Sequence, residues 1–246
     1  MSRRTIVVGD IHGCFDELAE LLAKAALGDE DRVVAVGDLI TKGEKNREVL
    51  DLFISDARFS AVLGNHDLAL LRYWRGETDS LKSAQRKTAA QLEDGRERYA
   101  GYLASLPLMI DLGSHLVVHA GVRPGVPFDA QTADDLTALR TLGADRTNRE
   151  GTPWFEAYRG EKTILFGHWP ASAPRRAPCA IGLDTGCVYG YDLTAYIIET
   201  GEFVSVRARR AYSVPKWQRR RRRSKVARAK TLLKHLLRML TGRPRG

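Results

Sequence analysis

The sequence predicts an α/β fold built around a largely parallel sheet, and the evidence lies in the first 70 residues. The apolar runs at 5–8, 32–36 and 59–63 have the length and composition of buried strands. Each run ends at a glycine that is followed by a polar residue, and segments 15–26 and 44–54 between them carry apolar residues at helical spacing. This strand–helix alternation implies parallel strands with helices packed on the faces of the sheet.

The remainder of the chain adds further elements to this sheet-based core. Residues 67–105 are mostly helical in pattern and predict an inserted or capping segment. Further strands are predicted at 107–111, 115–119, 163–166, 194–198 and 203–209. A chain of 246 residues is long enough for one sizeable core. We therefore predict one catalytic domain over residues 1–210, followed by a basic tail over 211–246.

Composition places the protein among ordinary soluble chains. Hydrophobic residues make up 43% of the sequence, and no apolar run approaches the roughly 20 residues that a membrane-spanning helix needs. The apolar stretch before Gly9 is too short for a secretory signal. Cys14, Cys179 and Cys187 are odd in number and widely spaced, which favours neither a disulfide framework nor a CxxC zinc site. These features predict a cytoplasmic protein.

The positive charge is concentrated at the C-terminal end. The net charge is +9, but 16 of the 39 Lys and Arg residues lie from Val206 onward, where no Asp or Glu occurs. The remaining 23 basic residues face 30 acidic ones, so the body carries a net charge of about −7. An arginine run at 219–223 precedes apolar residues near one helical face, namely Val226, Leu233, Leu236, Leu237 and Leu240.

Two partner classes fit this tail. A basic amphipathic helix can bind an anionic membrane surface, which would place the protein peripherally at a membrane, and an arginine run can bind RNA or DNA phosphates. A disordered tail that aids solubility, or one that folds back on the acidic body, is an equal alternative. The sequence leaves the oligomeric state open.

Polar residues with metal-binding chemistry recur where the predicted strands end. They are Asp10, His12, Asp38, Asn65, His66, His119 and His168. The carboxyl ends of parallel strands converge on one crevice, so these side chains are expected to lie together. Histidine and aspartate with one asparagine suit borderline divalent ions such as Mn, Fe or Zn. Taken singly, a Gly-Asp pair is usually a turn and a lone histidine is usually structural.

Five motifs in this order resemble the calcineurin-like metallophosphoesterases, in particular their phosphoprotein-phosphatase branch. The motifs are Gly9-Asp10-Ile11-His12-Gly13, Gly37-Asp38-Leu39, Gly64-Asn65-His66-Asp67, His119-Ala120-Gly121 and Gly167-His168. Residues 166–169 and 183–190, with Gly13-Cys14, are similar to the bacterial symmetrical diadenosine tetraphosphatases and their relatives. The resemblance covers roughly residues 5–200. It implies a four-layer αββα sandwich of two facing sheets, with a helical insertion and a site at the strand ends.

The resemblance also implies a role for each motif residue. One metal would be held by Asp10, His12 and Asp38, and a second by Asp38, Asn65, His119 and His168. A hydroxide bridging the two ions would attack phosphorus in line, and His66 would protonate the leaving oxygen. The expected cofactors are two divalent transition-metal ions, with manganese named first and iron, zinc, cobalt or nickel as alternatives.

The loop at 37–43, Gly-Asp-Leu-Ile-Thr-Lys-Gly, departs from the family pattern. Thr41 and Lys42 stand where the phosphoprotein phosphatases carry an aspartate that orients the acid and an arginine that clamps phosphate. Lysine is a point charge and not a bidentate fork, so the replacement changes phosphate recognition. A plain solvated turn at Thr41-Lys42 is the alternative.

Further phosphate and base contacts are expected from outside the motifs. Arg140 is the best candidate for a second phosphate-binding cation, with Arg123 and Arg149 as rivals. Trp169 could stack on a nucleobase or could pack in the core.

All seven ligand or acid positions are intact, which indicates an active metal-dependent phosphohydrolase. Its expected substrate is a phosphorylated small molecule, a dinucleoside polyphosphate or a related nucleotide. A Ser/Thr or Tyr phosphoprotein phosphatase is the alternative within the same chemistry. The alternative of another class is a nucleic-acid- or membrane-binding module whose metal site is structural.

Overall fold

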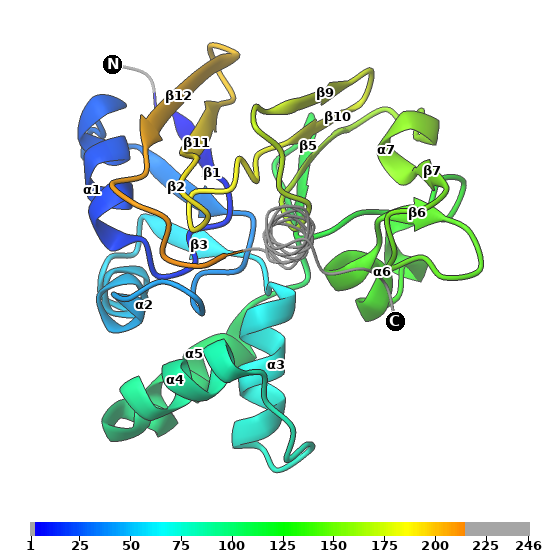
Figure 1. Ribbon diagram of the computed structural model, residues 1–246. Coiled ribbons are helices and arrows are strands. Elements are labelled where there is room, and N and C mark those ends of the chain that lie inside the picture. Colours follow the sequence, from blue (N-terminus) through cyan, green and yellow to red (C-terminus); the bar gives the residue numbers. More distant parts are fainter. Residues whose placement is uncertain (1–2, 215–246) are drawn as a thin grey trace, which may run out of the picture. The chain divides into compact units, whose positions relative to one another are not determined.

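The computed structural model describes residues 3–214, and its strands form two five-stranded sheets (Figure 1). The first sheet runs in the order β12 (Glu202–Arg207), β11 (Asp192–Ile197), β1 (Thr5–Val8), β2 (Arg32–Ala35) and β3 (Phe59–Ala61). Strands β1, β2 and β3 are parallel, and β11 and β12 extend the sheet in antiparallel fashion. All five strands were expected from the sequence, and the parallel centre is confirmed.

The second sheet repeats the same plan with a parallel centre and antiparallel edges. Its order is β4 (Met109–Asp111), β5 (His115–Val118), β8 (Thr163–Phe166), β10 (Ala180–Gly182) and β9 (Arg175–Ala177). Strands β5, β8 and β10 are parallel. A separate hairpin pairs β6 (Thr141–Leu142) with β7 (Thr152–Pro153). Strands β6, β7, β9 and β10 were not predicted from the sequence: the first three contain few apolar residues, and β10 is interrupted by a glycine, so none lies in an apolar run like that at 59–63.

Helices cover the outer faces of both sheets. In the first half, α1 (Phe15–Lys24) and α2 (Asn46–Ser55) lie against the strands. They are followed by α3 (Asn65–Trp74), α4 (Ser83–Gln91) and α5 (Arg96–Ser105), with a 3₁₀ turn η1 (Glu93–Gly95). The second half adds α6 (Ala133–Ala138), α7 (Trp154–Ala157) and the 3₁₀ turn η2 (Phe128–Ala130). Helices α3 to α5 form the predicted helical insertion, which projects below β3 in the view of Figure 1.

The hydrophobic core has three layers, one between the two sheets and one on the outer face of each, because successive side chains of a strand point to opposite faces. Val7 on β1 packs between the sheets, in a layer completed by Val34, Val36, Val62, Val117, Leu165 and Leu183. Its neighbours Ile6 and Val8 point to the opposite face and pack against Leu18 and Leu21 of α1. Val118 and Phe166 pack against Trp154 of α7 on the far side of the second sheet. The predicted four-layer αββα sandwich is therefore confirmed.

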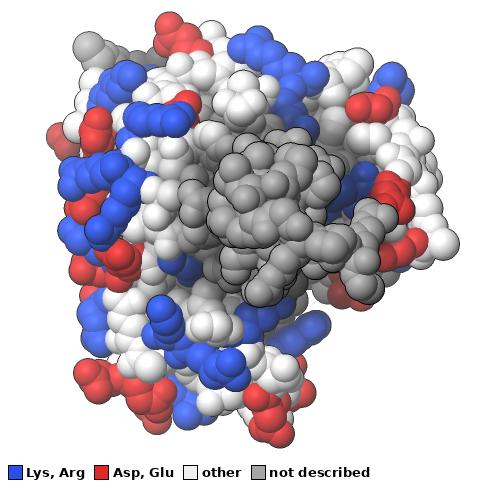
Figure 2. Space-filling model, viewed as in Figure 1, with Lys and Arg blue, Asp and Glu red and all other residues white. Residues whose placement is uncertain are grey.

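The predicted basic tail lies outside the described residues from position 215 onward, so its helix, its partners and the 210/211 domain boundary stay predictions. Among residues 3–214, no helix is long and apolar enough to cross a membrane. Acidic and basic side chains are interspersed over the described surface in the view of Figure 2.

Glycine residues of the motifs allow the strand-end loops to approach each other closely. A Cβ atom on Gly64 would lie 2.1 Å from the backbone nitrogen of Asp38, and one on Gly167 would lie 1.9 Å from Oδ1 of Asp10. Both distances are far below van der Waals contact. Glycine at these positions therefore brings β2 against α3 and β1 against the loop after β8, which gathers the polar residues at one edge.

We expect Gly64→Ala and Gly101→Ala to change stability in opposite directions. The added methyl group at Gly64 overlaps the backbone of Asp38, so we expect a loss of about 1–3 kcal/mol in unfolding free energy. Gly101 lies inside α5, and a Cβ there meets no atom within 4 Å, so alanine should stabilise the helix by about 0.5–1 kcal/mol. Urea unfolding of both variants and of the wild type measures these changes in unfolding free energy. Equal effects would contradict the close approach at Gly64.

Candidate metal centre

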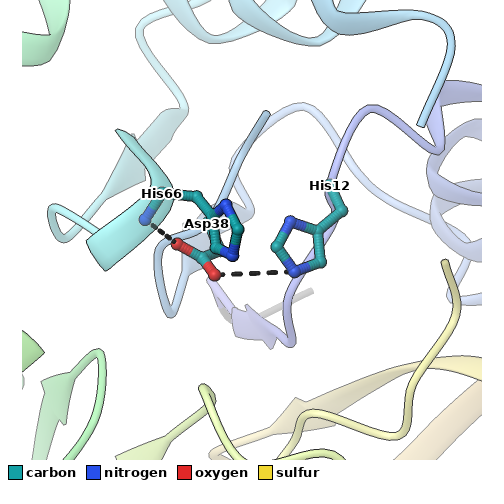
Figure 3. A group of neighbouring side chains, drawn as sticks. All are labelled: His12, Asp38 and His66. Atoms are coloured by element: carbon teal, nitrogen blue, oxygen red, sulfur yellow. Dashed lines mark hydrogen bonds and ion pairs between the residues drawn. The ribbon is translucent and has the colours of Figure 1, made fainter. Parts of the chain in front are cut away.

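Asp38 is the residue around which the polar cluster is built. It follows β2, is 2% exposed, and presents its two carboxylate oxygens to histidines from different sheets. Oδ2 lies 3.5 Å from Nε2 of His12, and Oδ1 lies 3.5 Å from Nε2 of His119. The backbone N–H of His66 also donates to Oδ1 at 2.8 Å, and Figure 3 shows the His12 and His66 contacts on either side of the carboxylate.

A second group of donors surrounds Asn65 at the first residue of α3. Oδ1 of Asn65 lies 3.0 Å from Nε2 of His119 and 2.8 Å from Nδ1 of His168. The backbone N–H of His168 donates to both carboxylate oxygens of Asp10 at 3.1 Å. Oδ2 of Asp10 is in turn 4.0 Å from Nε2 of His12. The structure thus brings all seven predicted ligand or acid residues into one connected cluster.

Backbone carbonyls fix which nitrogen of two histidines faces the cluster. Nδ1 of His12 lies 3.1 Å from the carbonyl oxygen of Ile40, and Nδ1 of His119 lies 2.9 Å from that of Val36. A carbonyl can only accept, so each Nδ1 carries the proton and donates it. Each Nε2 then directs a lone pair at Asp38. Metal-ligating histidines are usually oriented by such an outer hydrogen bond.

Burial shifts the pKa of the clustered aspartate and histidine side chains toward their neutral forms. Desolvation raises the pKa of Asp38 and of Asp184 to about 6, and that of Asp67 to about 7. Desolvation, with repulsion from Asp184 and Asp38, raises the pKa of Asp10 well above its usual value. Desolvation lowers the pKa of His119 to about 4. Crowded carboxylates and neutral imidazoles are donors that fit borderline divalent cations.

Left-handed backbone conformations concentrate in the same loops. The φ angles of His12, Asp38 and His168 are 52°, 51° and 65°, and those of Thr41 and Lys42 are 83° and 76°. Non-glycine residues seldom adopt positive φ, and a β-branched threonine does so at a particular cost. Such strain persists only where the surrounding structure enforces it, which marks these loops as a functional site.

The solvated-turn alternative for Thr41-Lys42 is wrong. Thr41 is fully buried, and its backbone N–H donates to Oδ1 of Asn46 at 2.7 Å. The Nζ atom of Lys42 donates to Nε2 of His12 at 2.7 Å and lies 5.3 Å from the ring centroid of Tyr189. Lys42 therefore extends into the cluster and not into solvent.

Among the candidate arginines, Arg140 has the environment expected of a phosphate-binding residue. Its charge opposes the rise that burial causes in the pKa of Asp38 and adds to the fall that burial causes in the pKa of His168. Its Nη1 donates to the carbonyl of Thr147 at 2.6 Å, and its Nε has no partner among the described residues. Arg123, by contrast, is paired with Asp135 at 2.8 Å.

Arg149 and Trp169, the other two residues considered for substrate contacts, have different surroundings from Arg140. The charge of Arg149 lowers the pKa of Arg140, after the larger effect of burial, so the two cations lie near each other. Trp169 packs against Phe155 at a centroid distance of 5.8 Å, and the Arg175 guanidinium lies 5.0 Å from its ring centroid. These contacts favour the packing role that the sequence left open for Trp169.

Two buried carboxylates were not assigned a role from the sequence. Asp67 accepts the backbone N–H groups of Leu39 and Ile40 at 3.2 and 3.3 Å, so it holds the loop that carries Asp38. Asp184 follows β10 and raises the pKa of Asp10. A strand-end position was the signal for Asp184, but the short run before it is interrupted by Gly182 and was not predicted as a strand. Asp67 stands three residues after Gly64, the spacing of a helix capping box.

Comparison with known proteins gives consistent matches over most of the chain. The family model described as calcineurin-like phosphoesterase matches residues 3–203. The asymmetrical bis(5'-nucleosyl)-tetraphosphatase PrpE of Bacillus subtilis (strain 168) is 31% identical over 81% of this chain and 93% of its own length. The symmetrical bis(5'-nucleosyl)-tetraphosphatase of Vibrio parahaemolyticus is 32% identical over 77% of this chain and 93% of its own.

A solved structure agrees with these relatives. The crystal structure of a candidate diadenosine tetraphosphatase is 33% identical, with a TM-score of 0.71, and the match covers 85% of this chain and 95% of that one.

We expect Asp38→Asn to stabilise the metal-free protein while weakening its metal binding. Because Asp38 has a raised pKa in the folded state, its ionisation lowers stability by about 1–3 kcal/mol above pH 6, at 1.36 kcal/mol per pKa unit. Asparagine removes that penalty. The gain should therefore be present at pH 8 and disappear as the pH falls through about 6 to about 4, where the wild-type carboxyl is protonated. Thermal unfolding in chelator at both pH values measures it.

Asp29→Asn is the matched control, because the Asp29 side chain is fully exposed. The control should show no gain at either pH and should keep the wild-type response to added Mn²⁺. A gain for Asp38→Asn that is the same at pH 4 and pH 8 would contradict a buried, ionised Asp38.

Proposed function

The chain belongs to the calcineurin-like phosphoesterase family, and we propose that it hydrolyses a phosphoric anhydride bond in a dinucleoside polyphosphate or a related nucleotide. The observation that carries the proposal is the placement of Asp38 between two donor groups, one around His12 and one around His119. Family members are dinuclear metal-dependent hydrolases of phosphoric ester or anhydride bonds. The relatives named for bis(5'-nucleosyl)-tetraphosphate cleavage support the nucleotide substrate.

The two donor groups suggest how the ligands would be divided between two metal ions. Asp10, His12 and Asp38 would hold one, and Asp38, Asn65, His119 and His168 would hold the other, with Asp38 common to both. Manganese is our first choice because imidazole, carboxylate and amide oxygen together suit borderline ions. Such ions, when bound, supply Lewis acidity toward a phosphate oxygen and acidify a water molecule.

In this proposal, His66 is the proton donor to the leaving oxygen. Its ring stands perpendicular to that of His12 at a centroid distance of 5.1 Å, and its Nδ1 has no partner among the described residues. Burial and the charge of Lys42 lower the pKa of His66 well below its usual value. Thr41 offers no carboxylate that could counter this shift, so His66 is neutral at pH 7 until a polyanionic substrate binds.

A lowered pKa leaves little His66 protonated at pH 7, and this favours an anhydride over a phosphomonoester. A nucleotide phosphate leaves as an anion whose own pKa is about 6, so it needs little protonation. A serine or threonine alkoxide is far more basic and requires a protonated donor. Replacement of the aspartate by Thr41 therefore costs least on a polyphosphate. A nucleotide polyphosphatase is thus favoured over a phosphoprotein phosphatase.

Lys42 and Arg140 are the cations available to the substrate phosphates. Lys42 Nζ already lies among the donors, and the charge of Arg140 acts on Asp38. A point charge such as lysine accepts many phosphate geometries, while an arginine fork suits one planar pair of oxygens. The lysine therefore suits a polyphosphate chain that can be engaged at more than one phosphorus.

A substrate panel tests the proposal. The full chain is supplied in turn with Mn²⁺, Mg²⁺, Zn²⁺, Co²⁺ or Ni²⁺ and assayed on diadenosine tetraphosphate, phosphopeptides and p-nitrophenyl phosphate. We expect the highest kcat/KM on the dinucleotide. Two ADP molecules would identify central cleavage, and ATP with AMP would identify asymmetrical cleavage. Metal-dependent turnover of phosphopeptides alone would instead support the phosphoprotein phosphatase, and no turnover with any metal would favour the binding module.

We expect His66→Asn to lower kcat much more on substrates with basic leaving groups than on p-nitrophenyl phosphate. The nitrophenolate anion leaves readily without a proton, so loss of the acid should matter little there. On an alkyl phosphate we expect a loss of about 10²–10⁴-fold. The ratio of kcat values on the two substrates is the measurement. Equal losses would assign His66 to metal or phosphate positioning.

We expect Lys42→Ala to lower kcat/KM on the dinucleotide by an amount equivalent to about 1–3 kcal/mol, the scale of a lost charged hydrogen bond. Thr41→Asp with Lys42→Arg would restore a carboxylate beside His66 and a bidentate fork. The double variant should gain activity on phosphomonoesters relative to the dinucleotide, and non-additively, because both residues act on one phosphoryl group. If the ratio of the two efficiencies is the same for wild type, singles and double, the loop does not set substrate preference.

A further inference from the structure

A second cluster of metal-binding side chains lies outside the donor groups around Asp38. Cys14 precedes α1, Glu17 lies in its first turn, and Cys187 lies in the loop after β10. All three residues are at most 1% exposed. One donor atom from each, the two Sγ atoms and a carboxylate oxygen, lies within 4.8 Å of the other two. Neither cysteine forms a disulfide.

Glu17 has one carboxylate oxygen in use and one that is free. Oε1 accepts the hydroxyl of Tyr212 at 2.6 Å and the backbone N–H of Arg209 at 3.0 Å. Oε2 is buried and has no hydrogen-bond partner among the described residues. A buried carboxylate oxygen without a partner is costly, so it indicates an occupant beyond the protein atoms. An ion could take Oε2 without breaking either bond to Oε1.

The two buried thiols are expected to stay reduced and so to remain available as ligands. A hydrogen bond with Cys14, together with burial, raises the pKa of Cys187. A thiol with a raised pKa holds little thiolate and attacks oxidants and disulfides slowly. A thiophilic divalent ion binds the thiolate form, so its binding would release the thiol protons and strengthen as the pH rises.

We propose that Cys14 Sγ, Cys187 Sγ and Glu17 Oε2 form a binding site for one thiophilic divalent ion of the Zn²⁺ class. Tetrahedral zinc with bonds of about 2.3 Å to sulfur and 2.0–2.2 Å to oxygen places its ligands roughly 3.5–3.8 Å apart. Contraction of the cluster by about 1 Å satisfies this geometry. A cavity of about 330 Å³, lined in part by Cys14, Glu17 and Tyr212, adjoins two of the three ligands and has room for a water molecule as the fourth.

The ion would join three segments next to the catalytic loops. Cys14 stands two residues after His12, Cys187 three residues after Asp184, and Tyr212 near the end of the described chain. The backbone N–H of Tyr212 donates to the carbonyl of Val188 at 3.0 Å, so Glu17 already links α1 to the loop that holds Cys187. Occupancy should therefore raise the thermal stability of the protein without supplying a catalytic group.

Sulfur ligation gives this site a signature that the donor groups around Asp38 lack, since those contain no cysteine. The metal-free full chain is titrated with Cd²⁺ while the ultraviolet thiolate-to-cadmium charge-transfer absorption is recorded. We expect a saturable band from the wild-type protein that corresponds to two thiolates per ion. Absence of the band in the wild type overturns the proposal and requires no variant.

The variants assign the ligands. Cys14→Ser and Cys187→Ser should each weaken Cd²⁺ binding at least 100-fold by this band, and Glu17→Gln about tenfold. Cys179→Ser is the matched control and should leave the titration unchanged, because Cys179 lies outside the cluster; the protein has three cysteines in all. Asp38→Asn should leave it unchanged as well, which makes the result independent of the proposed hydrolytic function. A band that survives loss of both Cys14 and Cys187, or that requires Cys179, overturns the assignment.

Zn²⁺ provides a second readout. Added Zn²⁺ should raise the unfolding midpoint of Asp38→Asn by several degrees and that of Asp38→Asn with Cys14→Ser and Cys187→Ser by much less. Equal shifts in the two proteins would contradict a stabilising ion at the cysteines.

Discussion

The Asp38 carboxylate is held almost free of solvent between imidazoles from two different sheets, and the arrangement of the site depends on it. Four carboxylates, those of Asp10, Asp38, Asp67 and Asp184, lie close enough to affect one another's ionisation. Burying such a group without cations is unfavourable, which is why their pKa values rise. The fold therefore holds four carboxylates together whose negative charge must be balanced by bound cations or by protons.

The loops resist this internal repulsion because they are cross-linked through backbone groups. Asp67 binds the N–H groups of Leu39 and Ile40, and Asp10 binds that of His168. These bonds connect β1 and β2 of the first sheet to α3 and to the loop after β8. Left-handed backbone at His12, Asp38 and His168 shows that the cross-links outweigh local conformational preference. Stability is thus traded for a preorganised set of ligands.

The sequence predicted the parts of this arrangement that depend on periodicity and on strand ends. Strands β1, β2 and β3 and the seven polar residues that converge at the sheet edge follow from short apolar runs that stop at glycine. Asp184 did not follow, because the short run before it, Ala-Ile-Gly-Leu, is interrupted by a glycine. The buried state of Thr41 was also not predictable: its residue type is typical of a turn, and its backbone bond to Asn46, five residues on, follows neither helical nor strand periodicity.

Lys42 suggests how the proposed site would differ in substrate preference from the phosphoprotein phosphatases while keeping all of the proposed ligands. Its ammonium group contacts His12, and its charge adds to burial in lowering the pKa of His66. In the absence of substrate, Lys42 therefore disfavours protonation of His66. A polyphosphate brings several negative charges that would draw Lys42 away from His12 and restore proton affinity to His66. A phosphomonoester brings at most two. In the proposed mechanism, Lys42 would therefore make the protonation of His66 depend on substrate charge, and this dependence would favour a polyanion.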